Sequence, residues 1–289
     1  MTPRRVSAWM LAAGLAVGTL ADRQGERVVP RAGEYWILAG DFHVHGAPGD
    51  GTLLPWALRR EAQRAGLDVI AVTNHNTTFA ARFAHWWGRS FTGPFPIVMV
   101  GQEITSPDYH MTAVGITHPV DWRQPAAEAI RDVHGQGGVA IAAHPTLKYA
   151  AGYDDRALAI LDGAEAANDV DPLALEEYAR FRRRAHAVNA DLAAIGSSDF
   201  HATPMLARAR TYLLVRERTE AGVLEAIRAG RTVAADDQGR LYGSRDLVGV
   251  VSAQRPAGRS DDNAVWRRVS AVSAWVGAFG LMLFGKQSP

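Results

Sequence analysis

The chain has 289 residues, 47% of them hydrophobic and 21% charged, which is enough for one large domain or two small ones. Its formal net charge of +1 gives no broad field for polyanions, so we expect no long nucleic-acid partner. There is no cysteine, which excludes disulfides and thiolate ligands and leaves histidine and carboxylates to hold any metal.

The N-terminus carries two basic residues followed by an apolar stretch. Arg4 and Arg5 precede the segment from Val6 to Ala21, and Thr19-Leu20-Ala21 resembles a cleavage site. Residues 1–29 are therefore predicted to be a signal peptide or an N-terminal membrane anchor, with a buried helix as the alternative. We expect an exported, extracytoplasmic protein with a membrane tether at one or both ends.

Residues 30–236 alternate short apolar segments with amphipathic ones, and we expect them to form the globular domain. The pattern predicts strands at Tyr35–His43, Asp68–Thr73, Ile97–Ile104, His110–Ile116, Val139–Ala143, Gly163–Ala167, Ala193–Ser197 and Thr211–Val215. It predicts helices at Pro55–Ala65, Phe79–Trp87, Pro125–Gln136, Pro172–Asn189 and Thr219–Ala229. This alternation favours an α/β fold with parallel strands, and the strand count suits a barrel with its site at the C-terminal strand ends.

The C-terminal part of the chain differs in composition from the middle. Residues 237–263 are rich in Gly, Arg, Ser and Asp and are predicted to be a linker. Residues 264–289 contain an apolar run from Val269 to Gly285, which is predicted to be either a minimal membrane anchor or a helix docked on the domain.

Histidines and carboxylates recur where the predicted strands end or begin. His43 and His45 are one residue apart in a strand, so their side chains point the same way and can chelate one ion. A single such histidine is more often structural than a ligand, but a whole set on one rim predicts a metal site. The set is His43, His45, Asp50, His75, Glu103, His110, His144, Asp199 and His201. The other histidines, His85, His118, His134 and His186, lack this context and are predicted not to be ligands.

These segments resemble the polymerase-and-histidinol-phosphatase (PHP) family of metal-dependent hydrolases. The resemblance covers about Asp41 to His201 and is carried by Asp-Phe-His-Val-His, Thr-Asn-His-Asn, Gly-Gln-Glu-Ile-Thr, His110-Met111, Ala-His-Pro and Gly-Ser-Ser-Asp-Phe-His. It implies a distorted (β/α)7 barrel that binds two or three divalent ions, which are zinc, manganese or iron.

The resemblance also implies how the ligands divide. One ion would be held by His43, His45 and Asp199 with Glu103 as a bridge, a second by Asp50, His75 and His201, and a third by His110, His144 and Glu103. Glu103, Asp199 and His201 would take part in catalysis. Two positions depart from the family pattern, because Asn74 stands where Asp is common and Gly46 where a hydroxyl residue is frequent.

The family default is hydrolysis of a small phosphate ester by a metal-activated water. Lys148 and Arg208, or Arg210, are predicted to contact the phosphate. An exported carboxyl- or carbamate-ester hydrolase, similar to the secreted carbaryl-type branch, is the first alternative. Its apolar pocket would use an aromatic stretch, although core packing is the commoner role of such a stretch; the residues are Phe83, Trp86, Trp87 and Phe91. A non-catalytic, membrane-tethered metal-binding module is the second alternative.

Overall fold

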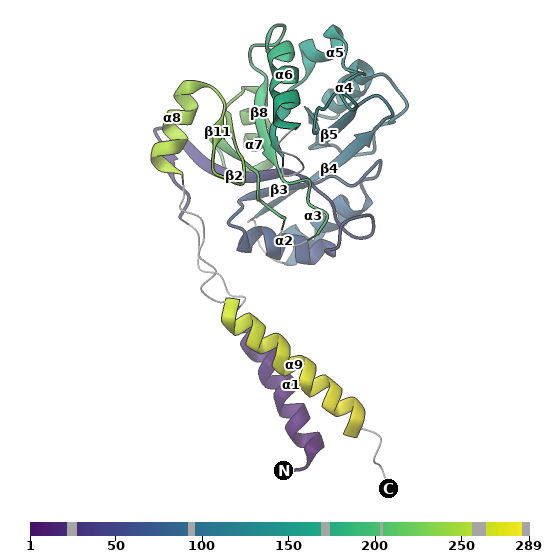
Figure 1. The fold of residues 1–289 in the computed structure, drawn as a ribbon, viewed down its shortest axis with the longest axis vertical. Coiled ribbons are helices and arrows are strands. Elements are labelled where there is room, and N and C mark those ends of the chain that lie inside the picture. Colours follow the sequence, from purple (N-terminus) through teal and green to yellow (C-terminus); the bar gives the residue numbers. More distant parts are fainter. Residues whose placement is uncertain (22–27, 92–95, 169–173, 203–204, 256–263, 285–289) are drawn as a thin grey trace. The chain divides into compact units, whose positions relative to one another are not determined.

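The computed structural model describes residues 1–21, 28–91, 96–168, 174–202, 205–255 and 264–284, and Figure 1 shows its elements. The chain divides into two units. One consists of Met1–Arg27 with Gly258–Pro289, and the other is the globular unit, Val28–Ala257. The globular unit extends beyond residue 236, its predicted C-terminal boundary, because helix and strand also form between residues 237 and 255.

The globular unit is built on one sheet that contains all eight predicted strands. In the described residues its strands are β1 (Arg31–Ala32), β2 (Tyr35–Val44), β3 (Val69–Val72), β4 (Ile97–Thr105), β5 (His110–Val114), β6 (Val139–Ala142), β7 (Gly163–Asn168), β8 (Ala193–Ser197), β9 (Arg210–Val215), β10 (Thr232–Ala235) and β11 (Leu241–Tyr242). Their order is β11-β10-β9-β2-β3-β4-β5-β6-β7-β8, with β1 paired to β2.

The sheet is mixed, which differs from the predicted parallel-stranded arrangement. Strand β5 runs antiparallel to both β4 and β6, and β9 runs antiparallel to β2 and β10. The segment between Thr105 and His110 is too short for the crossover that parallel neighbours need. The reversal has a useful consequence, since it brings the first residue of β5 to the same rim as the last residues of β4.

The two ends of the sheet approach each other, so the sheet is nearly closed into a barrel. Thr211 of β9 links to β8 through its hydroxyl, which donates to the Gly196 carbonyl oxygen at 2.8 Å and accepts from the Gly196 N–H at 2.9 Å. Beyond the strand ends, a bridge joins Val44 to Phe200. The predicted α/β fold of distorted-barrel type is confirmed.

Helices cover the outside of this sheet (Figure 1). They are α2 (Pro55–Arg64), α3 (Phe79–Phe91), α4 (Ala126–Gly135), α5 (Asp155–Ile160), α6 (Ala174–His186), α7 (Glu220–Arg228) and α8 (Arg245–Gln254). Each longer helix buries one apolar stripe, as α4 does with Ala126, Ile130 and Val133, which lie in a core cluster with Met111 and Ala140 of the sheet. Such burial fixes the strands whose ends carry the site.

Part of the predicted linker, residues 237–263, is folded. Strand β11 pairs with β10 through Ala234 and Tyr242, and α8 begins at a Ser244 cap and buries Val251. The Gly, Arg, Ser and Asp residues around them concealed a short hairpin and an amphipathic helix, although half of the residues of α8 are apolar. Residues 256–263 of the predicted linker lie outside the described part of the chain.

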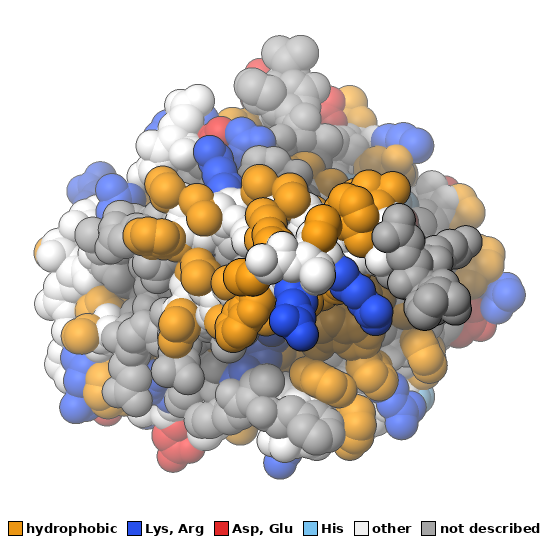
Figure 2. Space-filling view, turned by 90° about the horizontal axis from the view of Figure 1, so that it is seen from below, with side chains coloured by type: hydrophobic (Ala, Val, Ile, Leu, Met, Phe, Trp, Pro, Cys, Tyr) orange, Lys and Arg blue, Asp and Glu red, His pale blue; other side chains and the backbone are white. Residues whose placement is uncertain are grey.

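The first unit contains two helices, α1 (Pro3–Ala21) and α9 (Ala264–Phe284), which we call the helix pair. Both terminal predictions fall here. Within the described residues, neither helix has the length and apolarity needed to cross a membrane. Large apolar side chains are nevertheless exposed on it, such as Trp9 at 68% and Trp275 at 63%. Figure 2 shows one face of the molecule, on which hydrophobic side chains (orange) lie among Lys and Arg side chains (blue).

Candidate metal centre

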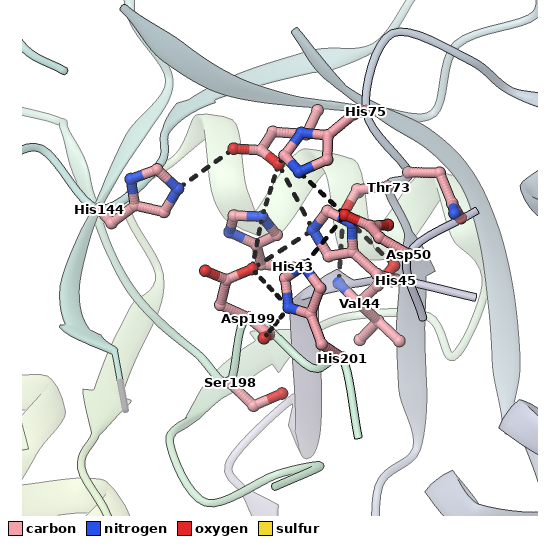
Figure 3. A network of polar contacts seen from close by, with 12 residues as sticks. His43, Val44, His45, Asp50, Thr73, His75, His144, Ser198, Asp199 and His201 are labelled. Carbon is pink, nitrogen blue, oxygen red and sulfur yellow. Dashed lines mark hydrogen bonds and ion pairs between the residues drawn. The ribbon is translucent and has the colours of Figure 1, made fainter. Parts of the chain in front are cut away.

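The nine predicted ligand residues all lie at one rim of the barrel (Figure 3). They come from the ends of β2, β3, β4, β6 and β8 and from the beginning of β5. Because β5 is reversed, its first residue, His110, meets Glu103 near the end of β4. Figure 3 shows the labelled imidazoles pointing toward one another across a small space.

The first group is built around four buried atoms that face each other. His43 Nε2 lies 3.3 Å from Glu103 Oε2 and 3.2 Å from Asp199 Oδ1. His45 Nε2 lies 3.4 and 3.3 Å from the same two oxygens. Among the described residues, none of these four atoms has a hydrogen-bond partner.

Buried polar atoms without partners are costly and need an explanation. Neighbouring donors of an ion that is bound tetrahedrally at 2.0–2.1 Å are about 3.3–3.4 Å apart, and each of the two imidazole nitrogens lies at about this distance from both oxygens. The same atoms are a histidine and carboxylate set that suits Zn, Mn or Fe. The residues present therefore fit a divalent ion at this position.

A second group surrounds Asp50 on the more open side of the rim. Asp50 Oδ2 lies 3.0 Å from His75 Nε2 and 3.2 Å from His201 Nε2, while its Oδ1 lies 3.0 Å from His45 Nδ1. The side chains of Asp50, His75 and His201 are 37–40% exposed. This group can therefore be reached by a substrate from solvent.

A third group uses the other oxygen of Glu103. Glu103 Oε1 lies 2.9 Å from His110 Nδ1 and 3.1 Å from His144 Nε2, whereas Oε2 faces His43, His45 and His75. The two oxygens of one fully buried carboxylate thus face two different groups of imidazoles. This geometry is the one required of a bridging ligand.

The electrostatics of the rim favour positive charge. Burial lowers the pKa of His45, but the neighbouring carboxylates of Asp199 and Glu103 outweigh this effect and raise the pKa to about 9. Burial likewise opposes ionisation of Glu103, yet His43 and His110 hold the pKa of Glu103 well below its usual range. Carboxylates that stabilise protonated imidazoles this strongly would also stabilise a cation in their place.

Two of the predicted ligands have an uncommon backbone conformation. His144 has φ of 26° and Asp199 has φ of 49°, in the left-handed region that non-glycine residues seldom occupy. Each follows the end of a buried strand, and this conformation turns the chain sharply there. Strain of this kind gathers at functional sites, where the surrounding structure holds it in place.

Sequence analysis missed two buried carboxylates that support the ligands. Glu165 of β7 is fully buried; its Oε1 lies 2.9 Å from His43 Nδ1, and its Oε2 accepts from the His144 N–H at 2.8 Å. Asp41 accepts from the Ser198 N–H and so ties β2 to the segment that carries Asp199. Asp41 shares a strand face with His43, and that alternation could have revealed it.

Burial raises the pKa of Asp41 to about 6, although hydrogen bonds from Ser198 oppose the rise. For Glu165, the only local signal in the sequence was an acidic residue inside an otherwise apolar strand. Both carboxylates lie behind the ligands and not among them.

The two departures from the family pattern contact each other. Asn74 donates from Nδ2 to the Gly46 carbonyl oxygen at 2.6 Å and accepts at Oδ1 from the Gly46 N–H at 3.2 Å. This pair of bonds holds the start of the loop that carries Asp50. The amide at position 74 thus serves as both donor and acceptor, which a carboxylate cannot do.

The predicted substrate contacts have different surroundings. The Lys148 ammonium lies 2.8 Å from the Tyr149 hydroxyl, and the Tyr149 ring lies 4.1 Å from the His110 ring, next to the third group. Arg208 instead pairs with Asp237 at 3.5 Å. Arg210 donates to the Ala207 and Ala65 carbonyl oxygens, so it holds the backbone at these two residues together.

Side chains of the aromatic stretch contact one another and Trp56 of α2. Trp56 lies 6.2 Å from Phe83 and 5.9 Å from Trp87, and Phe83 lies 5.6 Å from Trp86, as ring-centroid distances. The side chain of Phe91 lies outside the described residues. Among the histidines predicted not to be ligands, His134 bonds Asp162 and His85 bonds the Val98 carbonyl oxygen.

The chain is similar to known proteins in part of its sequence and in its fold. Residues 178–232 match the family model described as PHP-associated. A two-domain protein from Bacteroides vulgatus, containing a predicted PHP-like metal-dependent phosphoesterase, is similar at 24% identity over 78% of this chain and 72% of its own, with a TM-score of 0.61. Among curated proteins, none matches the chain significantly.

Weaker likenesses are found to PsfC from Pseudomonas syringae (14% identity, 86% of this chain, 99% of that chain, TM-score 0.49) and to a putative metal-dependent phosphoesterase from Bifidobacterium adolescentis (21%, 56%, 87%, 0.42). The Bacteroides likeness shows a shared fold. Together with the PHP-associated segment, it confirms the resemblance to the PHP family, whereas the carbaryl-type branch stays a prediction.

Proposed function

We propose that the globular unit is a metal-dependent hydrolase that cleaves a small phosphate ester. The observation that carries the proposal is the convergence of four buried, unpartnered atoms from His43, His45, Glu103 and Asp199 beside two further ligand groups. The phosphate preference rests on the PHP resemblance and on Lys148, whose ammonium contacts the hydroxyl of Tyr149, a neighbour of His110.

The residues would divide their work as follows. His43, His45, Asp199 and Glu103 would hold one divalent ion, Asp50, His75 and His201 a second, and His110 and His144 with Glu103 a third. Bound ions supply Lewis-acid polarisation of the substrate and lower the pKa of water. Two or three ions fit these groups, and the donors suit zinc, manganese or iron.

The protein contributes orientation. Glu165 accepts the Nδ1 proton of His43, which leaves the Nε2 lone pair directed at the first group. The half-exposed histidines His75 and His201 leave one side of the rim open, and Lys148 offers a cation for the substrate oxygens.

The test is metal content and hydrolysis by the full chain. We expect two or three bound ions and turnover of bis- or mono-p-nitrophenyl phosphate that is lost with a chelator and restored by Zn²⁺ or Mn²⁺. Turnover of p-nitrophenyl acetate alone would replace the phosphate proposal with the carboxyl-ester alternative. Bound metal without any turnover would favour a binding module, and failure to bind metal would overturn the proposal.

A further inference from the structure

The helix pair has a seam made of small residues. Helices α1 and α9 run antiparallel, because Ser7 lies opposite Gly277 and Gly14 lies opposite Ala274. A Cβ at Gly14 would lie 2.6 Å from the Ala274 nitrogen, and one at Gly277 would lie 2.7 Å from the Ser7 carbonyl oxygen. The two backbones are therefore in direct contact, with no room for larger side chains between them.

Two serine side chains of α9 are turned into this seam. Ser270 donates from its hydroxyl to the Gly14 carbonyl oxygen at 2.7 Å, and Ser273 donates to the Met10 carbonyl oxygen at 2.9 Å. Ser270 is 8% exposed. These bonds cross from one helix to the other and remove the hydroxyls from the outer surface.

The exterior of the pair is apolar on both helices. Large side chains that are 49–73% exposed include Trp9, Leu15, Leu20, Val265, Trp266, Val269, Val272, Trp275, Val276, Phe279, Met282 and Leu283. On α9 they cover about half of the circumference at about 100° per residue. A helix pair in water buries large apolar residues and exposes polar ones. In lipid the arrangement is the reverse: small residues lie between the helices and large apolar residues lie on the outside.

Charged residues are confined to the ends of this apolar surface. Val6 to Ala21 of α1 and Val269 to Phe284 of α9 contain none, while Arg4 and Arg5 precede the first segment and Arg267 and Arg268 the second. Trp9 and Trp266 lie near opposite ends of the pair. Basic and tryptophan side chains at the margins of an apolar surface suit a membrane interface.

We propose that lipid is the partner of this exterior: the helix pair enters the bilayer as one unit and places its apolar side chains among the acyl chains. The proposal concerns the pair, since neither described helix is by itself long and apolar enough to cross a membrane. It requires that α1 is retained in the mature chain, because Gly14 and Met10 accept the α9 hydroxyl bonds. A second copy of the chain would cover only one side of the pair, so we favour lipid.

Co-flotation of the full chain with phosphatidylcholine vesicles in high salt tests the proposal. We expect binding that survives the salt, because it depends on apolar burial and not on charge. Val272→Asp, at a 64% exposed position near the middle of α9, should lower the vesicle partition coefficient roughly a hundredfold. The matched control is Val188→Asp, at a 48% exposed position of the globular unit, which should leave binding unchanged.

Two further measurements keep the proposal falsifiable. Hydrolysis by Val272→Asp should remain normal. Loss of vesicle binding can then be attributed neither to unfolding of the globular unit nor to a failure of the proposed function. Intact mass of the vesicle-bound protein should include α1. A mature chain that begins after Ala21 would overturn the proposal, as would a discrete lipid-free oligomer that ignores vesicles and dissociates in the Val272→Asp variant.

Discussion

The globular unit buries charged side chains in its interior, whereas the helix pair turns large apolar side chains outward. In the first, Glu103 is fully buried and surrounded by imidazoles. In the second, Trp9 and Trp275 are more than half exposed. Both arrangements are unfavourable for a protein alone in water. Each becomes favourable with a partner of one chemistry, cations for the rim and lipid for the helix pair.

The comparison implies that changes at the rim should leave the helix pair intact, and changes in the seam should leave hydrolysis intact. The largest effect is expected from loss of a ligand. Asp199→Ala and His75→Ala should each reduce metal binding and turnover by more than the roughly 10–100-fold typical of an outer partner. Circular dichroism should show an unchanged fold. His118→Ala, at an exposed histidine outside the rim, is the control, and retained activity in both ligand variants would refute the metal mechanism.

The metal-free rim should show a pH dependence that ions abolish. The folded-state pKa of His45 is raised from 6.5 to about 9, so its contribution to stability is full below pH 6.5 and disappears as the pH rises through 9. For this one group the loss amounts to about 3 kcal/mol. Unfolding of chelator-treated protein by urea should show this decrease. Added Zn²⁺ or Mn²⁺ should stabilise the protein more at pH 9 than at pH 6.5, and equal stabilisation at both would contradict proton competition.

Glu165→Gln tests whether the rim depends on a carboxylate that is not a ligand. Glu165 Oε2 accepts from the His144 N–H and from Asn168 Nδ2, so the glutamine oxygen should keep these bonds and present its NH₂ group to His43. His43 would then accept at Nδ1 and carry its proton on Nε2, directed at the first group. Metal affinity should fall roughly 10–100-fold by titration calorimetry. An unchanged affinity would show that Glu165 serves packing alone.

Asn74→Asp restores the residue common in the family and should nevertheless be harmful. The new carboxylate would face the Gly46 carbonyl oxygen, which now accepts from Asn74 Nδ2 at 2.6 Å. A lost bond and an unpaired buried acceptor cost about 1–3 kcal/mol. Thermal unfolding should occur at lower temperature. The double variant Asn74→Asp with Gly46→Ser tests whether the two departures from the family pattern depend on each other. If Asn74→Asp alone is as stable as the unchanged protein, they do not.

Much of the rim was predictable because its residues are local to strand ends. His43 and His45 share a strand face by alternation, and all eight predicted strands were found. The reversal of β5 was not predicted, because strand direction is decided by the length of a loop and not by periodicity. Glu165 was missed because its partner His43 is 122 residues away in the sequence.

The C-terminal hairpin and α8 were missed for a different reason. The segment 237–263 as a whole has the composition of a linker, which hid the apolar residues of α8, and only pairing with β10 makes Leu241 and Tyr242 a strand. The end segments were identified as apolar, yet their pairing depends on contacts between Gly14 and Ser270, which are 256 residues apart.

The smallest expected effect belongs to the helix pair. Ser270→Ala removes the hydroxyl that donates to the Gly14 carbonyl oxygen and leaves the seam otherwise unchanged. Hydrogen bonds between helices in lipid contribute about 0.6 kcal/mol on average. The substitution should therefore weaken the association of α1 with α9 only slightly, while hydrolysis stays unchanged. The association is measured in detergent, by cross-linking one cysteine introduced into each helix. Gly14→Leu, which fills the seam, should abolish the same cross-link. If the cross-link still forms in Gly14→Leu, the seam is not the contact between the helices. The contrast drawn between the globular unit and the helix pair would then be wrong for the helix pair.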